Sequence, residues 1–363
     1  MLDKQELQAL TNCALCANMC KYTCPIYLAS GSETLSPQKI ARLILYEDKD
    51  LLEDRQGFFD VVFSSAMCGA CSRHCIYEAY DLRKFIQKAR SKAHREGALP
   101  EETRKRLETF REFGNPNGER QLVDEGTSTA GYFLSCSGYK DEGVLRAMRR
   151  IVEASGQQVR IFGGADICCG APLYYAGDTD GFEGAARKMA ADIREKGLDR
   201  VIVDCPNCMR MMTKVYPEVG VDLQAEVIHT SEFLLGLLRE GRIEVRKESA
   251  RATYHDPCIL ANDFHITEAP RAILGELGFE LQEPAYSENH AHCCGGPAGA
   301  RIGHAGLADK VRTMRIAELK QTEAEVYASA CPTCKAVLSE SGIKDVTELV
   351  AERIVNGPGQ ARA

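Results

Sequence analysis

The sequence lacks an apolar run long enough to cross a membrane. One of its longest, residues 233–238, is far shorter than the roughly 20 residues that a membrane-spanning helix needs. Residues 1–7 carry charges where a secretory signal has its apolar stretch. No block of lysine and arginine is present to follow a phosphate backbone, and the formal net charge is −7. We therefore expect a cytoplasmic protein that has no direct membrane span, binds no nucleic acid and reaches a membrane only through a partner.

Nucleotide-binding loops are absent as well. Paired glycines occur at Gly163-Gly164 and Gly295-Gly296, but neither gives G-x-G-x-x-G or G-x-x-x-x-G-K-S/T between a strand and a helix. We expect no flavin or NAD in this chain, so a partner subunit must supply electrons for any redox reaction.

What the sequence has in excess is cysteine, with 17 in 363 residues. Hydrophobic residues make up 44% and charged residues 27%, so a hydrophobic core can form without disulfides or bound metal. Thiols stay reduced in the cytosol, and an odd number cannot pair fully within one chain. Metal or redox cofactors are the leading explanation.

From residue 131 onward, short apolar runs alternate with amphipathic stretches, a pattern typical of βα units around a parallel sheet. A helix is expected over residues 142–153, with Leu145, Met148 and Val152 on one face. The expected strands are residues 132–135, 159–162, 201–204, 226–228, 252–255, 279–282 and 325–329.

The cysteines of this region form two matching sets of five, which indicates an internal repeat. Both double cysteines precede a glycine, and both closing pairs have the form Cys-Pro-x-Cys. The first set is Cys136, Cys168, Cys169, Cys205 and Cys208; the second is Cys258, Cys293, Cys294, Cys331 and Cys334.

Five converging thiolates favour a polynuclear iron–sulfur cluster. Tetrahedral zinc takes four ligands, and adjacent cysteines are awkward donors to one ion. Buried cysteines acting as small hydrophobes are the other alternative. Gly170 and Gly295 would let the backbone approach sulfide closely, and Pro206 and Pro332 suit a first helical turn.

These two motifs resemble in full the paired CCG domains of the family that contains the catalytic subunits of heterodisulfide reductase. The resemblance implies one noncubane 4Fe-4S cluster per five-cysteine set, with a disulfide or thiol substrate bracketed between the two clusters. It also implies a flavoprotein or membrane cytochrome as the electron-transfer partner.

The N-terminal cysteines resemble the paired motifs of two-cluster ferredoxins, in which the last cysteine of each motif ligates the other cluster. The second motif has Ala79 where we expect a fourth cysteine. The motifs are Cys13-x2-Cys16-x3-Cys20-x3-Cys24 and Cys68-x2-Cys71-x3-Cys75.

Seven cysteines are one short of the eight that two 4Fe-4S clusters take. The crossed pattern gives Cys24 to the second motif's cluster and leaves a three-cysteine site at Cys13, Cys16 and Cys20. That site is a 3Fe-4S cluster, a 4Fe-4S cluster with an open iron, or one with a fourth ligand such as His74, Glu78 or Asp81. A zinc site made by Cys13, Cys16, Cys68 and Cys71 is the alternative, but it leaves three cysteines that bind no metal.

The expected fold is therefore an α-helical ferredoxin-like domain followed by two repeated α/β, Rossmann-like CCG subdomains. The expected boundaries are residues 1–95, a charged linker at 96–128, and the two CCG domains at 129–245 and 246–363.

The leading functional hypothesis is a relay, in which N-terminal clusters pass electrons to two catalytic clusters for heterodisulfide or thiol-type reduction. His255 and His292 could donate protons or hydrogen bonds nearby. The alternatives are a pure electron-transfer subunit of a flavin-linked dehydrogenase or bifurcating complex, and a zinc-stapled module without redox function.

Overall fold

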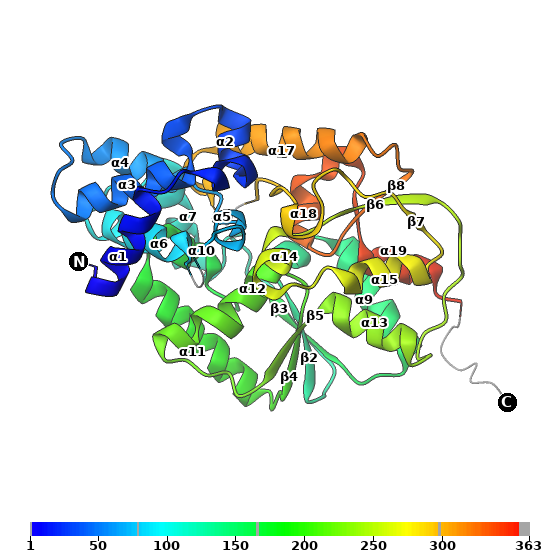
Figure 1. Ribbon diagram of the computed structural model, residues 1–363. Helices are drawn as coiled ribbons and strands as arrows, with labels where there is room; N and C mark the ends of the chain where they lie inside the picture. The colour runs from blue at the N-terminus through cyan, green and yellow to red at the C-terminus, as the bar shows by residue number, and fades with distance from the viewer. Residues whose placement is uncertain (1, 78–79, 165–166, 297–298, 356–363) are drawn as a thin grey trace.

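The computed structural model describes residues 2–77, 80–164, 167–296 and 299–355. Its N-terminal part is built from helices, which lie together on one side of the molecule in Figure 1. Apolar residues recur every three or four positions along α6, so Leu82, Phe85, Ile86 and Ala89 face the core. The helices are α1 (Lys4–Ala14), α2 (Pro25–Ser30), α3 (Pro37–Asp48), α4 (Arg55–Phe63), α5 (Ala70–Arg73), α6 (Leu82–Arg95) and α7 (Glu101–Phe113).

The rest of the described chain contains two sheets, and their parallel strands have the same topology. In the first, β3, β2, β4 and β5 run parallel in that order, with β1 antiparallel at the edge beside β3. In the second, β7, β6, β8 and β9 are all parallel. Numbered within each repeat, both sheets therefore have the order 2-1-3-4. The strands are β1 (Leu122–Glu125), β2 (Ala130–Leu134), β3 (Arg160–Gly164), β4 (Arg200–Val203), β5 (Glu226–His229), β6 (Arg251–His255), β7 (Glu280–Leu281), β8 (Val326–Ser329) and β9 (Lys344–Asp345).

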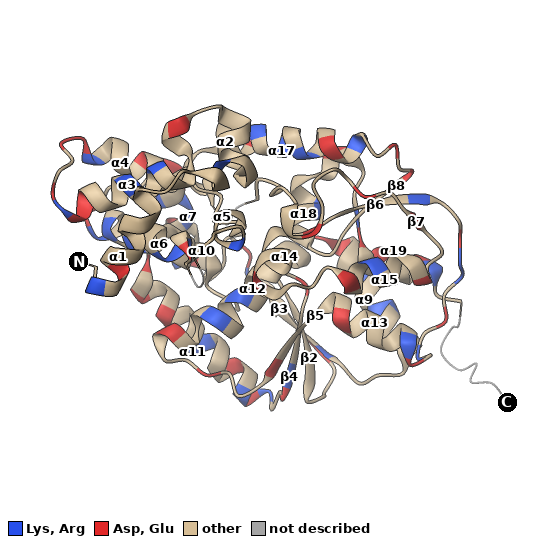
Figure 2. Ribbon diagram, viewed as in Figure 1, with Lys and Arg blue, Asp and Glu red and all other residues tan. Residues whose placement is uncertain are grey.

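Helices connect these strands. Charges of both signs alternate along the outer helices α11 and α17 (Figure 2). The first repeat contains α8 (Cys136–Tyr139), α9 (Glu142–Ser155), α10 (Ala171–Ala176), α11 (Thr179–Glu195), α12 (Pro206–Arg210) and α13 (Thr230–Arg239). The second contains α14 (Cys258–Phe264), α15 (Glu268–Glu276), α16 (Ala300–Gly303), α17 (Ala305–Lys320), α18 (Pro332–Val337) and α19 (Val346–Arg353).

The prediction of repeated α/β units with parallel sheets is confirmed, and all seven expected strands are present. β7 is shorter than expected, at two residues. β1 and β9 were not predicted. β1 is a mostly exposed edge strand and β9 has two residues, so neither carries the apolar alternation by which strands are recognised.

The segment expected to be a charged linker is folded against its neighbours. α7 packs against α10 and α16. The hydroxyl of Thr103 on α7 is buried and donates to the carbonyl of Ile302 at 2.6 Å. β1 then joins the first sheet, so α7 contacts both repeats before the chain enters the first one.

A glycine allows close contact between the N-terminal helices and the first repeat. Gly177 has φ +85°, and a Cβ there would lie 2.3 Å from the carbonyl oxygen of Arg90. Gly197 has a similar φ of +64° but open space around it.

We expect Gly177→Ala to destabilise the protein by about 1–3 kcal/mol more than Gly197→Ala, because both substitutions carry backbone strain but only the first forces two backbones apart. Thermal unfolding of the two variants, purified anaerobically, measures the difference. Equal melting temperatures would contradict this role for Gly177.

Candidate functional site

Two cysteines of each five-cysteine set lie at the carboxyl ends of two neighbouring strands of a sheet. Cys136 follows β2 and Cys205 follows β4, and these strands are neighbours. Cys258 and Cys331 follow β6 and β8 in the same way. Strand order reverses between these neighbours, and ligands of open parallel sheets bind at such reversals. The fold thus places both cysteine sets at the position where an α/β sheet holds its ligand.

The Cys-Pro-x-Cys motifs have the local structure that the sequence predicts. Pro206 and Pro332 occupy the first positions of α12 and α18, where the missing N–H costs nothing. Gly295 has φ +79°, and a Cβ there would lie 2.5 Å from the carbonyl oxygen of Ala308 on α17. Packing against the following helix therefore requires this glycine.

The first set of thiols is brought together in a buried group. Contacts with Cys168 and Cys208 hold the pKa of Cys169 well below the usual thiol value. Burial raises the pKa of Cys136, and the neighbouring thiols of Cys169 and Cys205 add to the increase.

The second set is equally close. The sulfurs of Cys258 and Cys293 are 3.9 Å apart, and those of Cys294 and Cys334 are 3.4 Å apart. Contact with Cys294 and then Cys331 raises the pKa of Cys334 well above its usual value. All 17 cysteines are free thiols. Five neighbouring thiols without disulfides, four of them buried, suit an iron–sulfur cluster, whose iron would neutralise the thiolates.

The two sets adjoin each other. Cys208, and then Cys331 of the other repeat, hold the pKa of Cys205 well below its usual value. The hydroxyls of Ser137 and Thr333 are 2.7 Å apart. Asn207 and Thr333, the variable residues of the two Cys-Pro-x-Cys motifs, line both a cavity of about 150 Å³ at the first set and one of about 30 Å³ at the second.

The N-terminal thiols form two groups. One contains Cys13, Cys16, Cys20 and Cys75: burial raises the pKa of Cys13 to about 11, and Cys75 and Cys16 contribute. Burial also raises the pKa of Cys20 to about 12, with Cys13 the strongest neighbouring thiol.

The other group consists of Cys24, Cys68 and Cys71, which line one small cavity together with Ser65. Burial raises the pKa of Cys71, and Cys68, Cys20 and Cys24 contribute.

This grouping corrects the crossed pattern expected from the sequence. The crossed pattern assigns Cys75 to the site of Cys24, Cys68 and Cys71, but it lies with Cys13 and Cys20. The group that is one thiol short is therefore the one containing Cys24. The sequence signal was the spacing Ser65-x2-Cys68-x2-Cys71-x3-Cys75, which is the usual ferredoxin spacing with serine in the first place.

The candidate fourth ligands are engaged elsewhere or lie outside the described residues. His74 Nε2 is 3.0 Å from the carbonyl oxygen of Asn289, and its ring stacks on His290. Asp81 accepts hydrogen bonds from Arg83. Glu78 and Ala79 lie outside the described residues.

The Cys24 group lies beside the second five-cysteine set. Burial raises the pKa of Cys68 above its usual value, and the next contribution comes from Cys293. Cys293 also contributes to the raised pKa of Cys24, after burial. The four thiol groups therefore follow one another in space: the Cys13 group, the Cys24 group, the second set and the first set.

A buried ionic network joins the three parts of the chain beside these groups. Asp263 on α14 pairs with Arg83 on α6 at 2.8 Å and with Arg210 on α12 at 2.9 Å. Arg210 also lies 3.4 Å from the hydroxyl of Tyr175, which donates to Asn207 at 2.8 Å. One carboxylate thus compensates cations from the N-terminal helices and the first repeat.

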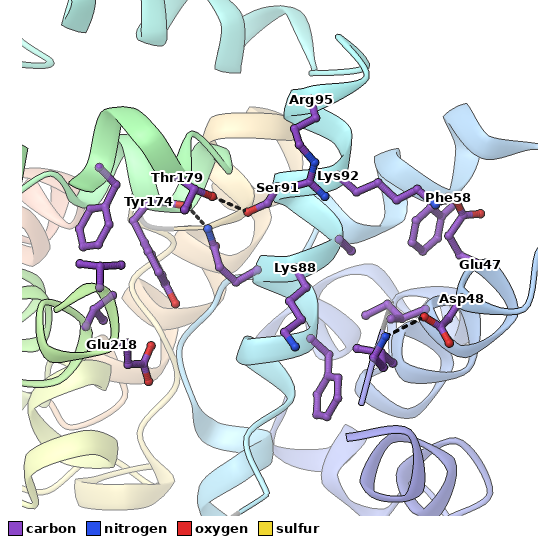
Figure 3. Close-up of a pocket in the computed structure, with 18 residues that line it drawn as sticks. Glu47, Asp48, Phe58, Lys88, Ser91, Lys92, Arg95, Tyr174, Thr179 and Glu218 are labelled. Atoms are coloured by element: carbon purple, nitrogen blue, oxygen red, sulfur yellow. Dashed lines mark hydrogen bonds and ion pairs between the residues drawn. The ribbon is translucent and has the colours of Figure 1, made fainter. Parts of the chain in front are cut away.

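A larger cavity, of about 470 Å³, lies between α6 and the first repeat (Figure 3). Its walls include Phe58, Phe85 and Phe182, and Lys88, Lys92 and Arg95 surround it. Among the described residues, no cysteine lines it, so it is not a cluster site.

Comparisons with known proteins agree with this arrangement. Residues 130–213 and 252–339 match the family model of the cysteine-rich domain, and residues 9–112 match that of the 4Fe-4S dicluster domain. One of the chains of the dihydromethanophenazine:CoB–CoM heterodisulfide reductase of Methanosarcina barkeri is 27% identical over 97% of this chain and 96% of its own length.

Other relatives carry different names. One of the chains of the fumarate reductase (CoM/CoB) of Methanothermobacter marburgensis is 27% identical over 95% of this chain and 71% of its length. The EtfAB:quinone oxidoreductase of Syntrophomonas wolfei is 23% identical over 87% of this chain and 48% of its length. A crystal structure of a hypothetical protein from Helicobacter pylori shares the fold, with a TM-score of 0.58 at 8% identity, over 90% of this chain and 68% of that one.

The chain is therefore an iron–sulfur protein with an electron-transfer role, of the kind found as a subunit of oxidoreductases. Specifically, it contains a pair of cysteine-rich CCG domains joined to a 4Fe-4S dicluster domain. Within the part of the chain that the structure describes, no helix has both the length and the apolar character needed to span a membrane.

Replacing the shared carboxylate should loosen the contact between the three parts. We expect Asp263→Asn to destabilise the protein by about 3–5 kcal/mol, because Arg210 remains buried without a counter-charge and Arg83 keeps only Asp81. Glu101→Gln, which breaks the exposed pair with Lys105, should leave the melting temperature unchanged. Thermal unfolding and limited proteolysis measure both effects; an Asp263→Asn protein as stable as the control would exclude this role.

Proposed function

We propose that this chain is the iron–sulfur subunit of an oxidoreductase complex that reduces a heterodisulfide or a similar disulfide between two noncubane 4Fe-4S clusters. The observation that carries the proposal is the contact between two complete five-thiol sets at Cys205 and Cys331. The two sets face a shared polar boundary at Asn207 and Thr333. A substrate there would meet both sets at once.

The proposed ligands follow from the grouping of the thiols. All five cysteines of each set would hold a noncubane cluster in a Rossmann-like subdomain. Cys13, Cys16, Cys20 and Cys75 would hold a 4Fe-4S cluster in the helical N-terminal domain. Cys24, Cys68 and Cys71 would hold a 3Fe-4S cluster, or a 4Fe-4S cluster whose fourth iron faces Ser65.

Ser65 offers a direct test of the three-thiol site. We expect Ser65→Cys to supply the eighth ligand and to convert a 3Fe-4S signal into a 4Fe-4S signal, or to change the spectrum of a site-differentiated 4Fe-4S cluster. Anaerobic EPR and iron analysis measure this, with Ser64→Cys as the matched control. An unchanged spectrum and iron content in Ser65→Cys would contradict the assignment.

The proposed reaction takes two electrons and two protons and converts one disulfide into two thiols. Bound clusters would supply single-electron steps and Lewis-acid iron for the developing thiolates. The chain's own residues would shape the substrate site. Tyr175 and Ser137 line the 150 Å³ cavity together with Arg106 of α7. Arg106 has no ion-pair partner among the described residues, so its charge is available to an anionic substrate.

A thiol titration tests the reaction and the role of Arg106 together. A small anionic thiol, such as a mercaptoalkane sulfonate, should perturb the EPR spectrum of the anaerobic protein, because product binding alters a cluster. Arg106→Gln should weaken this response about tenfold, and the exposed neighbour Arg104→Gln should not. A spectrum that responds to no thiol in the unmodified protein would refute disulfide chemistry here.

A pure electron-transfer subunit is the second candidate. Its support is the relative named EtfAB:quinone oxidoreductase and the consecutive arrangement of thiol groups, which suits conduction. In either case we propose a flavoprotein or membrane cytochrome partner and a cytoplasmic location, with any membrane contact made through that partner.

A further inference from the structure

The second repeat has a buried polar network behind its cysteines. Arg315 on α17 is fully buried and donates from Nε to Nδ1 of His255, at the end of β6, over 3.0 Å. Arg315 also donates to Glu318 at 2.9 Å and to the carbonyl of Tyr286 at 2.8 Å. Glu318 lies 2.6 Å from Nδ1 of His292. Arg315 is therefore held in place from three sides.

The contact with Arg315 fixes the tautomer of His255. A guanidinium group only donates hydrogen bonds, so Nδ1 of His255 must be the acceptor. The ring hydrogen is then on Nε2. This nitrogen is buried and has no hydrogen-bond partner among the described residues. Burying an N–H group without an acceptor costs free energy. We therefore expect a hydrogen-bond acceptor beside Nε2 of His255.

The neighbouring groups are two cysteines of the second set. A ring nitrogen of His255 and the sulfurs of Cys294 and Cys334 lie within 4.8 Å of one another. Three such groups could hold a metal ion directly. However, Nε2 carries the hydrogen and Nδ1 is engaged by Arg315, so the ring has no free lone pair for a metal. Near these cysteines, the ring of His255 can therefore offer only the N–H group of Nε2.

The first repeat has apolar residues at the same places. Phe133 stands three residues before Cys136, as His255 does before Cys258, and Ile167 precedes Cys168 as His292 precedes Cys293. Counting back from Gly197 and Glu323, the left-handed residues that follow α11 and α17, Met189 corresponds to Arg315. The three apolar residues are buried. Glu318 corresponds to Asp192, which pairs with Lys196 instead.

We infer that His255, oriented by Arg315, donates an N–H···S hydrogen bond to the second cluster and raises the reduction potential of that cluster above the value it would have without this donor. The inference rests on the proposed cluster in the second set. Added electrons make the cluster more negative, and a donor aimed at its sulfur stabilises the reduced form. His255 acts as a positioning and tuning residue, and Phe133 at the corresponding place in the first repeat has no side-chain N–H to donate.

A redox titration followed by EPR tests this inference on the full chain, purified anaerobically. His255→Phe places the residue of the first repeat at this position. It should lower the reduction potential of one of the two noncubane clusters. His255→Gln keeps a donor near the place of Nε2 and should restore most of the shift. Phe133→Leu, the matched change in the first repeat, should leave the potential that His255→Phe shifts unchanged.

Nitrogen hyperfine spectroscopy on protein with ¹⁵N-labelled histidine supplies a second readout. A weak coupling, as expected through a hydrogen bond, should be present in the parent protein and lost in His255→Phe. Arg315→Met should weaken it and lower the same potential, because the ring is then free to exchange tautomers. This variant keeps the test open if His255→Phe fails to fold.

Two results would overturn the inference: unchanged potentials in His255→Phe with full iron content, or a strong coupling typical of an imidazole bound to iron. Absence of noncubane signals from the parent protein would instead refute the proposed function.

Discussion

The carboxyl ends of neighbouring parallel strands are the constraint on which the site depends. A parallel sheet brings all its carboxyl ends to one edge, and a reversal of strand order opens a space between two of them. In both repeats, one cysteine follows each strand beside that reversal, and the double cysteine is added from the loop after the second strand of the repeat. Strand order alone therefore brings together cysteines that are far apart in the sequence.

The sequence was informative about the repeats because their chemistry is periodic. The double cysteines, the Cys-Pro-x-Cys pairs and the apolar strands recur at nearly constant spacing, so the α/β architecture and the two thiol sets followed. The contact between the sets at Cys205 and Cys331 could not be predicted, because it depends on how the two sheets face each other. The pairing of Asp263 with cations from two other parts of the chain is hidden for the same reason.

The N-terminal region shows the opposite case. The number of cysteines was sufficient to predict that one site is a ligand short. However, the second motif was matched to the ferredoxin motif at its first cysteine instead of at its last. Matching the second motif at its first cysteine placed the gap at Ala79, whereas the Cys75 thiol contributes to the raised pKa of Cys13 and so lies near it. Serine at position 65 carries no signal by itself, since serine is common at the ends of helices such as α4. Three-dimensional proximity was needed to give it meaning.

The order of the thiol groups has a consequence for how such a duplicated chain can diverge. The Cys24 group lies against the second set, and the second set lies against the first. With clusters bound as proposed, the groups are connected in series. A related protein that lost cysteines from the first repeat would keep a continuous series of clusters that ends at the second set. One that lost the second set would isolate the first from its source of electrons. Natural decay of the duplicated motif should therefore be tolerated in one half of the protein and not in the other.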